Sequence, residues 1–200
     1  MPPSLDERID IWRYAYARSA MNEAKATIEA LLSNKSLDRV VRRGLIYALI
    51  VCYARPFTKW QVTAAKRIVP LEDAPAVPDH LRVTHADYLE LRDKVVGHKD
   101  AIPGPGRTGH PNVVHLDVDA KGFNLHTIEI DVTDDALLEL GALADLFIAH
   151  CEAKLVPLMT KFKAELKALG PGSYDVTPAE SPAPWIRRVP PLGTFPAKRP

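Results

Sequence analysis

The sequence predicts a mainly α-helical protein. We expect an up-and-down helical bundle over residues 1–170, with a two-stranded β-hairpin inserted at 113–132. Apolar residues recur at helical spacing in 5–33 and again after Thr133, and residues 45–53 form a continuous apolar run. Between them, residues 113–118 alternate apolar and polar side chains, and a turn at 120–122 ends in Gly122, as in a hairpin.

The first two helices are expected at Leu5 to about Ser33 and at Leu37 to Ala54. The first has Ser4 as its N-cap and one buried stripe, formed by Leu5, Ile9, Trp12, Tyr16, Ala20, Ala24, Ile28 and Leu31. The second becomes apolar on every side after Arg43, so we expect it to be the central helix, covered from several sides. It should end at Arg55, because the residue before a proline disfavours helical backbone.

A third main helix is expected to begin at Thr84, whose hydroxyl would cap it, and to stop at Gly97. Before it, 61–69 is expected to form a short helix, and the prolines at 70, 75 and 78 interrupt the chain. On a helical wheel, Arg92 falls inside the apolar arc, between Tyr88 and Val95. An arginine in that position is costly unless another group pairs with it.

The last helix is expected from Thr133, its cap, to about Leu169, with a kink at Pro157. In the preceding hairpin the alternation slips between Leu125 and Ile128, which predicts a β-bulge near His126 or Thr127. The remaining segment, 171–200, is rich in proline. We expect it to be an extended or disordered tail that offers a protein partner a binding segment.

Composition limits the class of protein. The 200 residues carry a net charge of +1, so a nucleic-acid site would have to rest on local residues rather than on a strongly basic surface. The two cysteines, Cys52 and Cys151, are expected to be reduced core thiols. The N-terminus does not resemble a signal peptide, and no apolar run reaches about 18 residues. We therefore expect a cytoplasmic protein with no membrane segment.

The sequence contains two further patterns of ligand-binding residues, and neither predicts a site. The loop 100–112 contains Gly104, Gly106 and Gly109 in a G-x-G-x-x-G pattern, but a dinucleotide site needs a preceding strand and a following helix. Here a helix precedes and a strand follows. The histidines lack the close spacing of metal ligands, so we expect no metal and no cofactor, although a three-histidine site assembled across helices remains an alternative.

The end of the third helix carries the pattern R-x5-H, formed by Arg92 and His98. The glycine between them allows the chain to leave the helix axis and return an imidazole to the guanidinium. A histidine exchanges protons near neutral pH, and an arginine binds a phosphate through a bidentate fork. Two interpretations stay open: a site that acts on a phosphate, and a structural pair that ties helix ends together.

The local sequence ELRDKVVGHKD, together with YARPFT after the apolar helix, resembles the HEPN superfamily (higher eukaryote and prokaryote nucleotide-binding domains), in particular its abortive-infection-like bacterial branch. The resemblance covers about 5–169. It implies metal-independent cleavage of RNA by a homodimer, as a toxin or phage-defence protein. Some members carry a modified tyrosine two residues after the histidine, where this chain has Asp100, so that regulation is not expected here.

Under this resemblance, His98 transfers the proton, Arg92 binds the phosphate and Asp93 orients the imidazole. Arg55, Lys94 and Lys99 are further phosphate-binding candidates. The competing hypothesis is a non-enzymatic HEPN-like helical scaffold that dimerises and binds a partner through its tail. A metal-dependent hydrolase is a third alternative.

Overall fold

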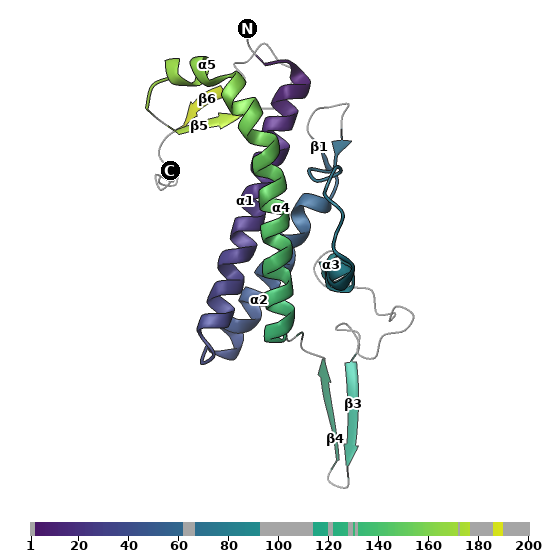
Figure 1. Ribbon diagram of the computed structural model, residues 1–200. Coiled ribbons are helices and arrows are strands. Elements are labelled where there is room, and N and C mark those ends of the chain that lie inside the picture. The colour runs from purple at the N-terminus through teal and green to yellow at the C-terminus, as the bar shows by residue number, and fades with distance from the viewer. Residues whose placement is uncertain are drawn as a thin grey trace, which may run out of the picture. The chain divides into compact units, whose positions relative to one another are not determined.

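The computed structural model describes residues 3–61, 67–92, 114–119, 122–127, 130, 132–171, 173–176 and 186–189. Over these residues the protein is mainly helical with small two-stranded antiparallel sheets, which confirms the fold class at that level (Figure 1). The chain divides into two compact units, which are described separately. Unit 1 comprises Met1–Ser19, Pro56–Ala74 and Ile148–Pro200, and unit 2 comprises Ala20–Arg55 and Pro75–Phe147.

Helix α1, Leu5–Ser33, has the predicted bounds. A reciprocal capping box closes its start. The backbone N–H of Glu7 donates to the Ser4 hydroxyl at 3.3 Å, and the backbone N–H of Ser4 donates to the Glu7 carboxylate at 2.9 Å. Two of the donors that a helix N-terminus leaves without intrahelical partners are satisfied in this way.

The buried stripe of α1 differs from the prediction near its N-terminus. Tyr14 is 3% exposed, whereas Trp12 and Tyr16 are half-buried and stack on each other with their ring centroids 5.3 Å apart. Trp60 packs edge-on against Tyr16, which leaves these aromatic rings at the margin of the core rather than in it. Further along the helix, Ala24, Ile28 and Leu31 are buried as expected.

Helix α2, Arg39–Ala54, begins after Asp38, whose carboxylate accepts from the backbone N–H of Val40 at 2.8 Å. The expectation that α2 is covered on several sides is wrong for its N-terminal half. Val40 and Val41 are 78% and 50% exposed, and Arg39, Arg43 and Gly44 are exposed as well, so this half of α2 faces solvent on most sides. The buried residues lie at the other end of the helix: Ile46, Leu49, Ile50, Cys52, Tyr53 and Ala54.

Helix α2 ends where the sequence predicted. The 3-10 helix η1, Arg55–Phe57, follows it directly. Pro56 is buried, and its carbonyl accepts from the backbone N–H of Leu71 at 2.9 Å. The proline thus both ends the helix and anchors the chain that returns from the next segment.

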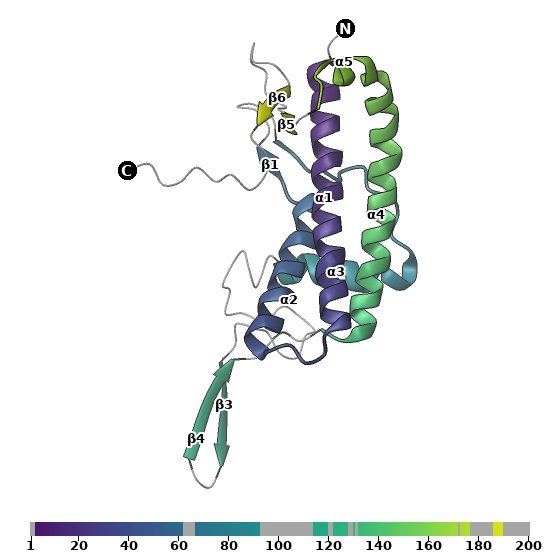
Figure 2. The same ribbon diagram turned by 90° about the vertical axis from the view of Figure 1, so that its left-hand side faces the viewer.

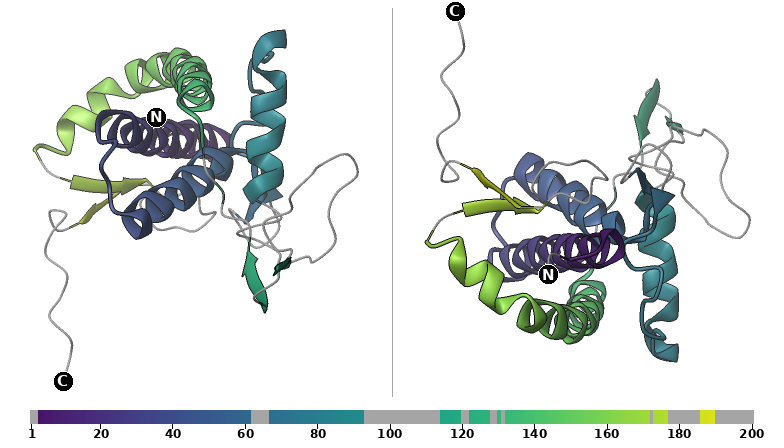
Figure 3. Two further views of the ribbon diagram at one scale, coloured as in Figure 1. Left: turned by 90° about the horizontal axis from the view of Figure 1, so that it is seen from below. Right: turned by 90° about the horizontal axis from the view of Figure 1, so that it is seen from above.

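Helix α3, Arg82–Leu91, follows the 3-10 helix η2, Asp79–Leu81, and packs against α2 in unit 2. It begins two residues earlier than predicted, so Thr84 lies inside the helix. The Thr84 hydroxyl donates to the Glu139 carboxylate instead of capping α3. Within unit 2, α3 lies across α2 and is seen end-on in Figure 1, whereas Figure 3 shows it from the side. The up-and-down arrangement expected for every helix therefore does not hold for α3.

Helix α4, Asp134–Lys161, is capped by Thr133 as predicted. The Thr133 hydroxyl accepts from the backbone N–H of Ala136 at 3.3 Å. In unit 2, α4 lies beside α1, and Lys25 pairs with Asp145 at 2.6 Å (Figure 2). The largest fully buried side chains of this unit come from α1, α2 and α4: Met21, Leu31, Leu49, Ile50, Tyr53, Leu137, Leu140, Leu143 and Phe147.

In unit 1, α4 continues through Pro157 to Lys161, and a short helix α5, Lys163–Ala168, follows. The predicted single helix to Leu169 is therefore interrupted, although at Phe162 rather than at the proline. The Phe162 side chain is 3% exposed, and turning the chain there keeps this ring in the core. Gly170, at φ +72°, ends the segment in a left-handed conformation.

The described residues at the two ends of 61–69, where a short helix was expected, are strands, and 62–66 lie outside the described part of the chain. Strands β1, Trp60–Gln61, and β2, Arg67–Ile68, pair antiparallel instead, with Trp60 opposite Ile68. The Arg67 guanidinium also donates to the Gln61 side-chain oxygen at 2.7 Å. Four β-branched residues in 61–69 favour strands over a helix, and these contacts stabilise the pairing.

The predicted hairpin is present as β3, Val114–Asp119, and β4, Gly122–Thr127. Its register is continuous from Val114 opposite Thr127 to Asp119 opposite Gly122, so the bulge expected near His126 or Thr127 is absent from these pairs. A second hairpin, β5, Ser173–Val176, with β6, Ile186–Val189, lies inside the segment that we expected to be extended or disordered.

Candidate functional site

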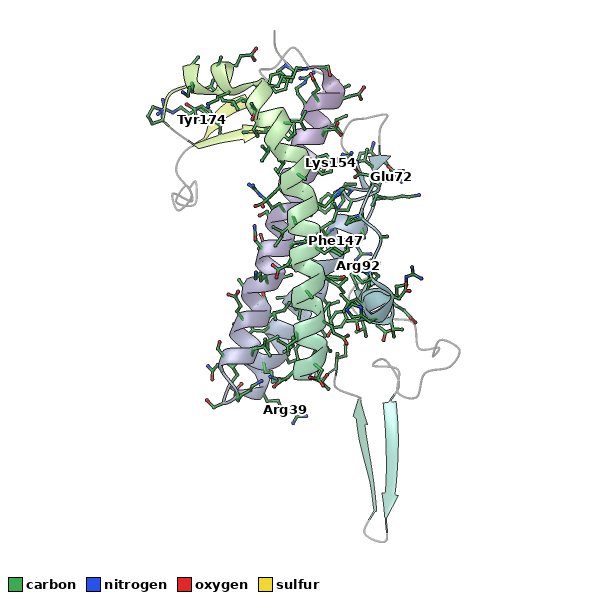
Figure 4. The ribbon with its side chains drawn as sticks, viewed as in Figure 1. Arg39, Glu72, Arg92, Phe147, Lys154 and Tyr174 are labelled. Atoms are coloured by element: carbon green, nitrogen blue, oxygen red, sulfur yellow. The ribbon has the colours of Figure 1, made fainter. Side chains whose placement is uncertain are left out.

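Arg92 lies directly after α3, five positions before Gly97, where the helix was expected to stop. Its backbone N–H donates to the carbonyls of Tyr88 and Leu89, and its side chain is half-buried (Figure 4). On a helix, residues 85, 88 and 92 share one face, because they are separated by three and four positions. The arginine is therefore placed on the face that carries His85 and Tyr88.

The other residues expected at this site lie outside the part of the chain that the structure describes. They are Asp93, Lys94, His98 and Lys99, together with the glycine at 97 that was expected to stop the helix. The pairing of Arg92 with His98 thus remains a prediction.

Arg55, the remaining phosphate-binding candidate, is the C-terminal cap of α2. One guanidinium nitrogen lies 3.3 Å from a carboxylate oxygen of Glu23 in α1, and both side chains are about half exposed to solvent. The same carboxylate accepts from the Cys52 thiol at 3.4 Å. A phosphate at Arg55 would therefore compete with a carboxylate that already holds the guanidinium.

Tyr53 of α2 forms a pair with the half-buried His85 of α3, and His85 lies on the same face of its helix as Arg92. The Tyr53 hydroxyl and His85 Nδ1 are 2.7 Å apart, and Tyr53 is fully buried. The rings of Tyr88 and Phe147 complete the surroundings: Tyr88 packs edge-on to Tyr53, and the Phe147 ring centroid lies 5.7 Å from that of His85. The cluster joins α2, α3 and α4 within unit 2.

Burial sets the charge state of this cluster. It lowers the pKa of His85 and raises the pKa values of Tyr53 and Tyr88. The histidine and both tyrosines are therefore neutral at physiological pH. The pair provides a hydrogen bond inside an aromatic core and positions α3, and through α3 the backbone that carries Arg92.

Sequence reasoning missed this pair because the histidines other than His98 were weighed only as metal ligands. With Thr84 as the expected cap, His85 fell in the first turn of the predicted helix, and no partner on another helix was expected for it. The spacing of residues 85, 88 and 92 could have indicated that His85 shares a helix face with Tyr88 and Arg92. A helix that begins at Arg82 brings these three residues to one face.

A second polar cluster, in unit 1, converges on Asp73. The Tyr14 hydroxyl donates to Asp73 Oδ2 at 2.7 Å, and Lys154 Nζ lies 3.1 Å from the same oxygen. Arg13 approaches the other carboxylate oxygen at 3.5 Å, and His150 Nε2 lies 3.7 Å from Oδ2. The cluster connects α1, the segment after β2 and α4; Lys154 is labelled in Figure 4.

The carboxylate of Asp73 is strongly stabilised in its charged form. Burial by itself would raise its pKa, but the hydrogen bonds from Tyr14 and Lys154 and the charge of Arg13 outweigh that effect and lower the pKa to about 2. Burial and the hydrogen bond to Asp73 raise the pKa of Tyr14. This arrangement of a fixed anion, two cations and a buried hydroxyl ties three segments together.

The described residues contain no group of three His, Cys, Asp or Glu side chains placed to hold a metal ion. Among the same residues, no helix is long and apolar enough to cross a membrane. Comparison with known proteins adds no relative to this geometry. No family model, no curated protein and no solved structure matches the chain.

Proposed function

We propose that the protein is a HEPN-like, metal-independent endoribonuclease that acts in the cytoplasm as a homodimer. One observation supports this function above the others. Arg92 is a half-buried guanidinium at the end of a helix, six residues before a histidine, in a mainly helical protein. A toxin or phage-defence role is the biological context that the resemblance suggests.

The proposed chemistry needs two groups and no metal. His98 takes the proton of a ribose 2′-hydroxyl, or returns one to the leaving 5′-oxygen, since an imidazole exchanges protons near neutral pH. The 2′-oxygen attacks the adjacent phosphorus, which releases the 5′-hydroxyl and leaves a 2′,3′-cyclic phosphate. Arg92 stabilises the negative charge that develops on the phosphate oxygens. Asp93 orients the imidazole, and Lys94 and Lys99 contact neighbouring phosphates.

The test is cleavage of single-stranded RNA by the full chain in the presence of EDTA. We expect His98→Ala to lower the cleavage rate by about 10²–10⁴-fold and Arg92→Ala by about 10²–10³-fold. The corresponding DNA should be inert, because it lacks the attacking 2′-hydroxyl. The products should carry 2′,3′-cyclic phosphate ends.

Two matched controls come from the same part of the chain. Arg82→Ala removes an exposed arginine from α3 that pairs with Asp79, and His80→Ala removes an exposed histidine from η2. Both variants should cleave RNA at the wild-type rate. Loss of activity in the controls, or cleavage that EDTA abolishes in the wild type, contradicts the proposal; the latter favours a metal-dependent hydrolase.

The alternative is a non-enzymatic HEPN-like scaffold that dimerises and binds a partner through its tail. The pairing of β5 with β6 favours it, because it gives the tail an ordered element that a partner can recognise. A wild-type protein that shows no EDTA-resistant cleavage at concentrations that saturate dimerisation would support the scaffold. Such a scaffold should still bind a protein partner, and deletion of residues 171–200 should abolish that binding.

A further inference from the structure

We propose that the exposed face of α2 is a docking groove for an acidic amphipathic helix of a partner protein. The groove is lined by Arg39, Val40, Arg43, Gly44 and Tyr47, and its volume is about 500 Å³. None of these lining residues belongs to the arginine–histidine motif or to the tail. The inference is therefore independent of the proposed ribonuclease function.

The shape of the groove comes from a glycine. A Cβ atom added at Gly44 would meet no atom within 4 Å, so the helix backbone is open to an approaching surface at this point. Val40 lies one turn before Gly44 and Tyr47 almost one turn after it, and both border the same face. This face accommodates a partner helix packed along α2, with a partner side chain seated over the glycine.

The apolar part of the surface suits a protein partner better than RNA. Val40 is 78% exposed and Val41 is 50% exposed. Of these two side chains Val40 lines the groove, and it loses its contact with water when an apolar helix stripe covers it. A ribose–phosphate backbone would leave it without an apolar partner.

The charge of the surface defines the partner further. Arg39 and Arg43 are one helical turn apart, about 6 Å along the axis. The sequence of α2 contains three arginines and no carboxylate. Arg43 also lies over the Tyr47 ring, 5.4 Å from its centroid, which holds the guanidinium at the edge of the groove. A helix with carboxylates at positions i and i+4 beside an apolar stripe matches both arginines.

A second copy of this chain fits less well. In a two-fold pairing of α2 with α2, the apolar contacts would form, but neither helix supplies a carboxylate to the other helix's arginines. An acidic partner helix satisfies the apolar and the charged parts of the surface together. Self-association through this face is therefore an alternative outcome of the test.

The experiment measures binding of a fluorescent synthetic helix to the full chain by anisotropy. The probe carries leucine and alanine at i, i+3, i+4 and i+7, with two glutamates one turn apart at the edge of this stripe. The control peptide has glutamine in place of both glutamates. We expect saturable binding of the acidic peptide, and binding of the control to be weaker by about tenfold, because two partly exposed charge pairs are lost.

Variants of the groove separate binding from folding. Gly44→Leu should fill the groove and abolish binding, while the melting temperature stays equal or rises, since leucine favours a helix more than glycine does. The double variant Arg39→Glu with Arg43→Glu should no longer bind the acidic peptide. Arg82→Glu, on an exposed site of α3, should bind it as the wild type does.

Several results would overturn the proposal. One is no binding of the acidic peptide, and another is equal affinity for both peptides. The proposal also fails if Gly44→Leu converts a dimer to a monomer in analytical ultracentrifugation and leaves peptide binding unchanged, because the face would then be an interface between copies. It fails equally if Arg39→Glu with Arg43→Glu abolishes binding of a single-stranded RNA oligonucleotide and leaves binding of the peptide unchanged.

Discussion

Asp73 illustrates how a single charged side chain can organise a unit. Its carboxylate binds groups from α1 and α4, and it belongs to neither helix. Nothing local in the sequence marks it, because its partners lie 59 or more positions away in the chain. Tyr14 was missed for the same reason: its burial follows from an acceptor that helical spacing does not reveal.

Replacing Asp73 with asparagine should destabilise the protein by about 1–2 kcal/mol at pH 7, a value reduced for solvent screening because the side chain is 34% exposed. The folded pKa of about 2 is below the unfolded value of about 3.9. A depressed carboxylate pKa stabilises the fold above the unfolded pKa, and that contribution is lost as pH falls through the folded one.

The measurement is urea unfolding of the wild type and Asp73→Asn from pH 7 to pH 3. The difference in unfolding free energy should be constant down to about pH 5 and shrink below pH 4. Asp79→Asn, at an exposed carboxylate that pairs with Arg82, should change stability little. A difference that stays constant below pH 4 would show that the charge of Asp73 does not supply the stability.

The helices differ in how well their ends and faces follow from sequence. The start of α1 and the cap of α4 were predicted correctly, because a cap needs residues a few positions apart. The exposure of the N-terminal half of α2 was not predicted. An apolar sequence shows that burial of a helix is favourable, but it does not show whether another helix packs against it. The same limit applies to α3, whose crossing of α2 depends on packing rather than on its own residues.

Two glycines provide a test of helix energetics. Gly44 lies inside α2 with open space around it, so Gly44→Ala should stabilise the protein by about 0.5–1 kcal/mol through helix propensity. Gly170 has φ +72°, where a Cβ is unfavourable, so Gly170→Ala should destabilise it by about 1 kcal/mol. Opposite shifts in urea unfolding are expected, and shifts of equal sign would contradict this account.

At the scale of the whole molecule, the sequence predicts features that depend on neighbouring residues and does not predict contacts between helices. Periodicity and turn residues predicted the mainly helical class and the hairpin, because these depend on neighbours in the chain. The arginine–histidine site stays a prediction, since the structure describes Arg92 and not His98. The Tyr53–His85 pair that supports α3 could not be predicted, because it depends on contacts between helices. Such contacts connect residues 32 positions apart, beyond the reach of any local pattern.

The net charge of +1 leads to a final prediction about RNA binding. A net charge near zero gives little overall attraction for RNA, so the salt dependence of binding should reflect the site's own cations. The proposed site has four: Arg55, Arg92, Lys94 and Lys99. For single-stranded RNA the slope of log K against log salt is about −0.7 per neutralised phosphate, which gives about −3.

Binding is measured with the His98→Ala variant, so that the RNA stays intact, by anisotropy between 50 and 300 mM salt, about the range in which counterion release dominates. Adding Arg92→Ala should make the slope shallower by about 0.7, and adding Lys94→Ala with Lys99→Ala by about 1.4. Arg82→Ala should leave it unchanged, because Arg82 lies outside the proposed site. A slope that none of the three substitutions at Arg92, Lys94 and Lys99 alters would place the RNA elsewhere on the protein, and the arginine and histidine would then be a structural pair.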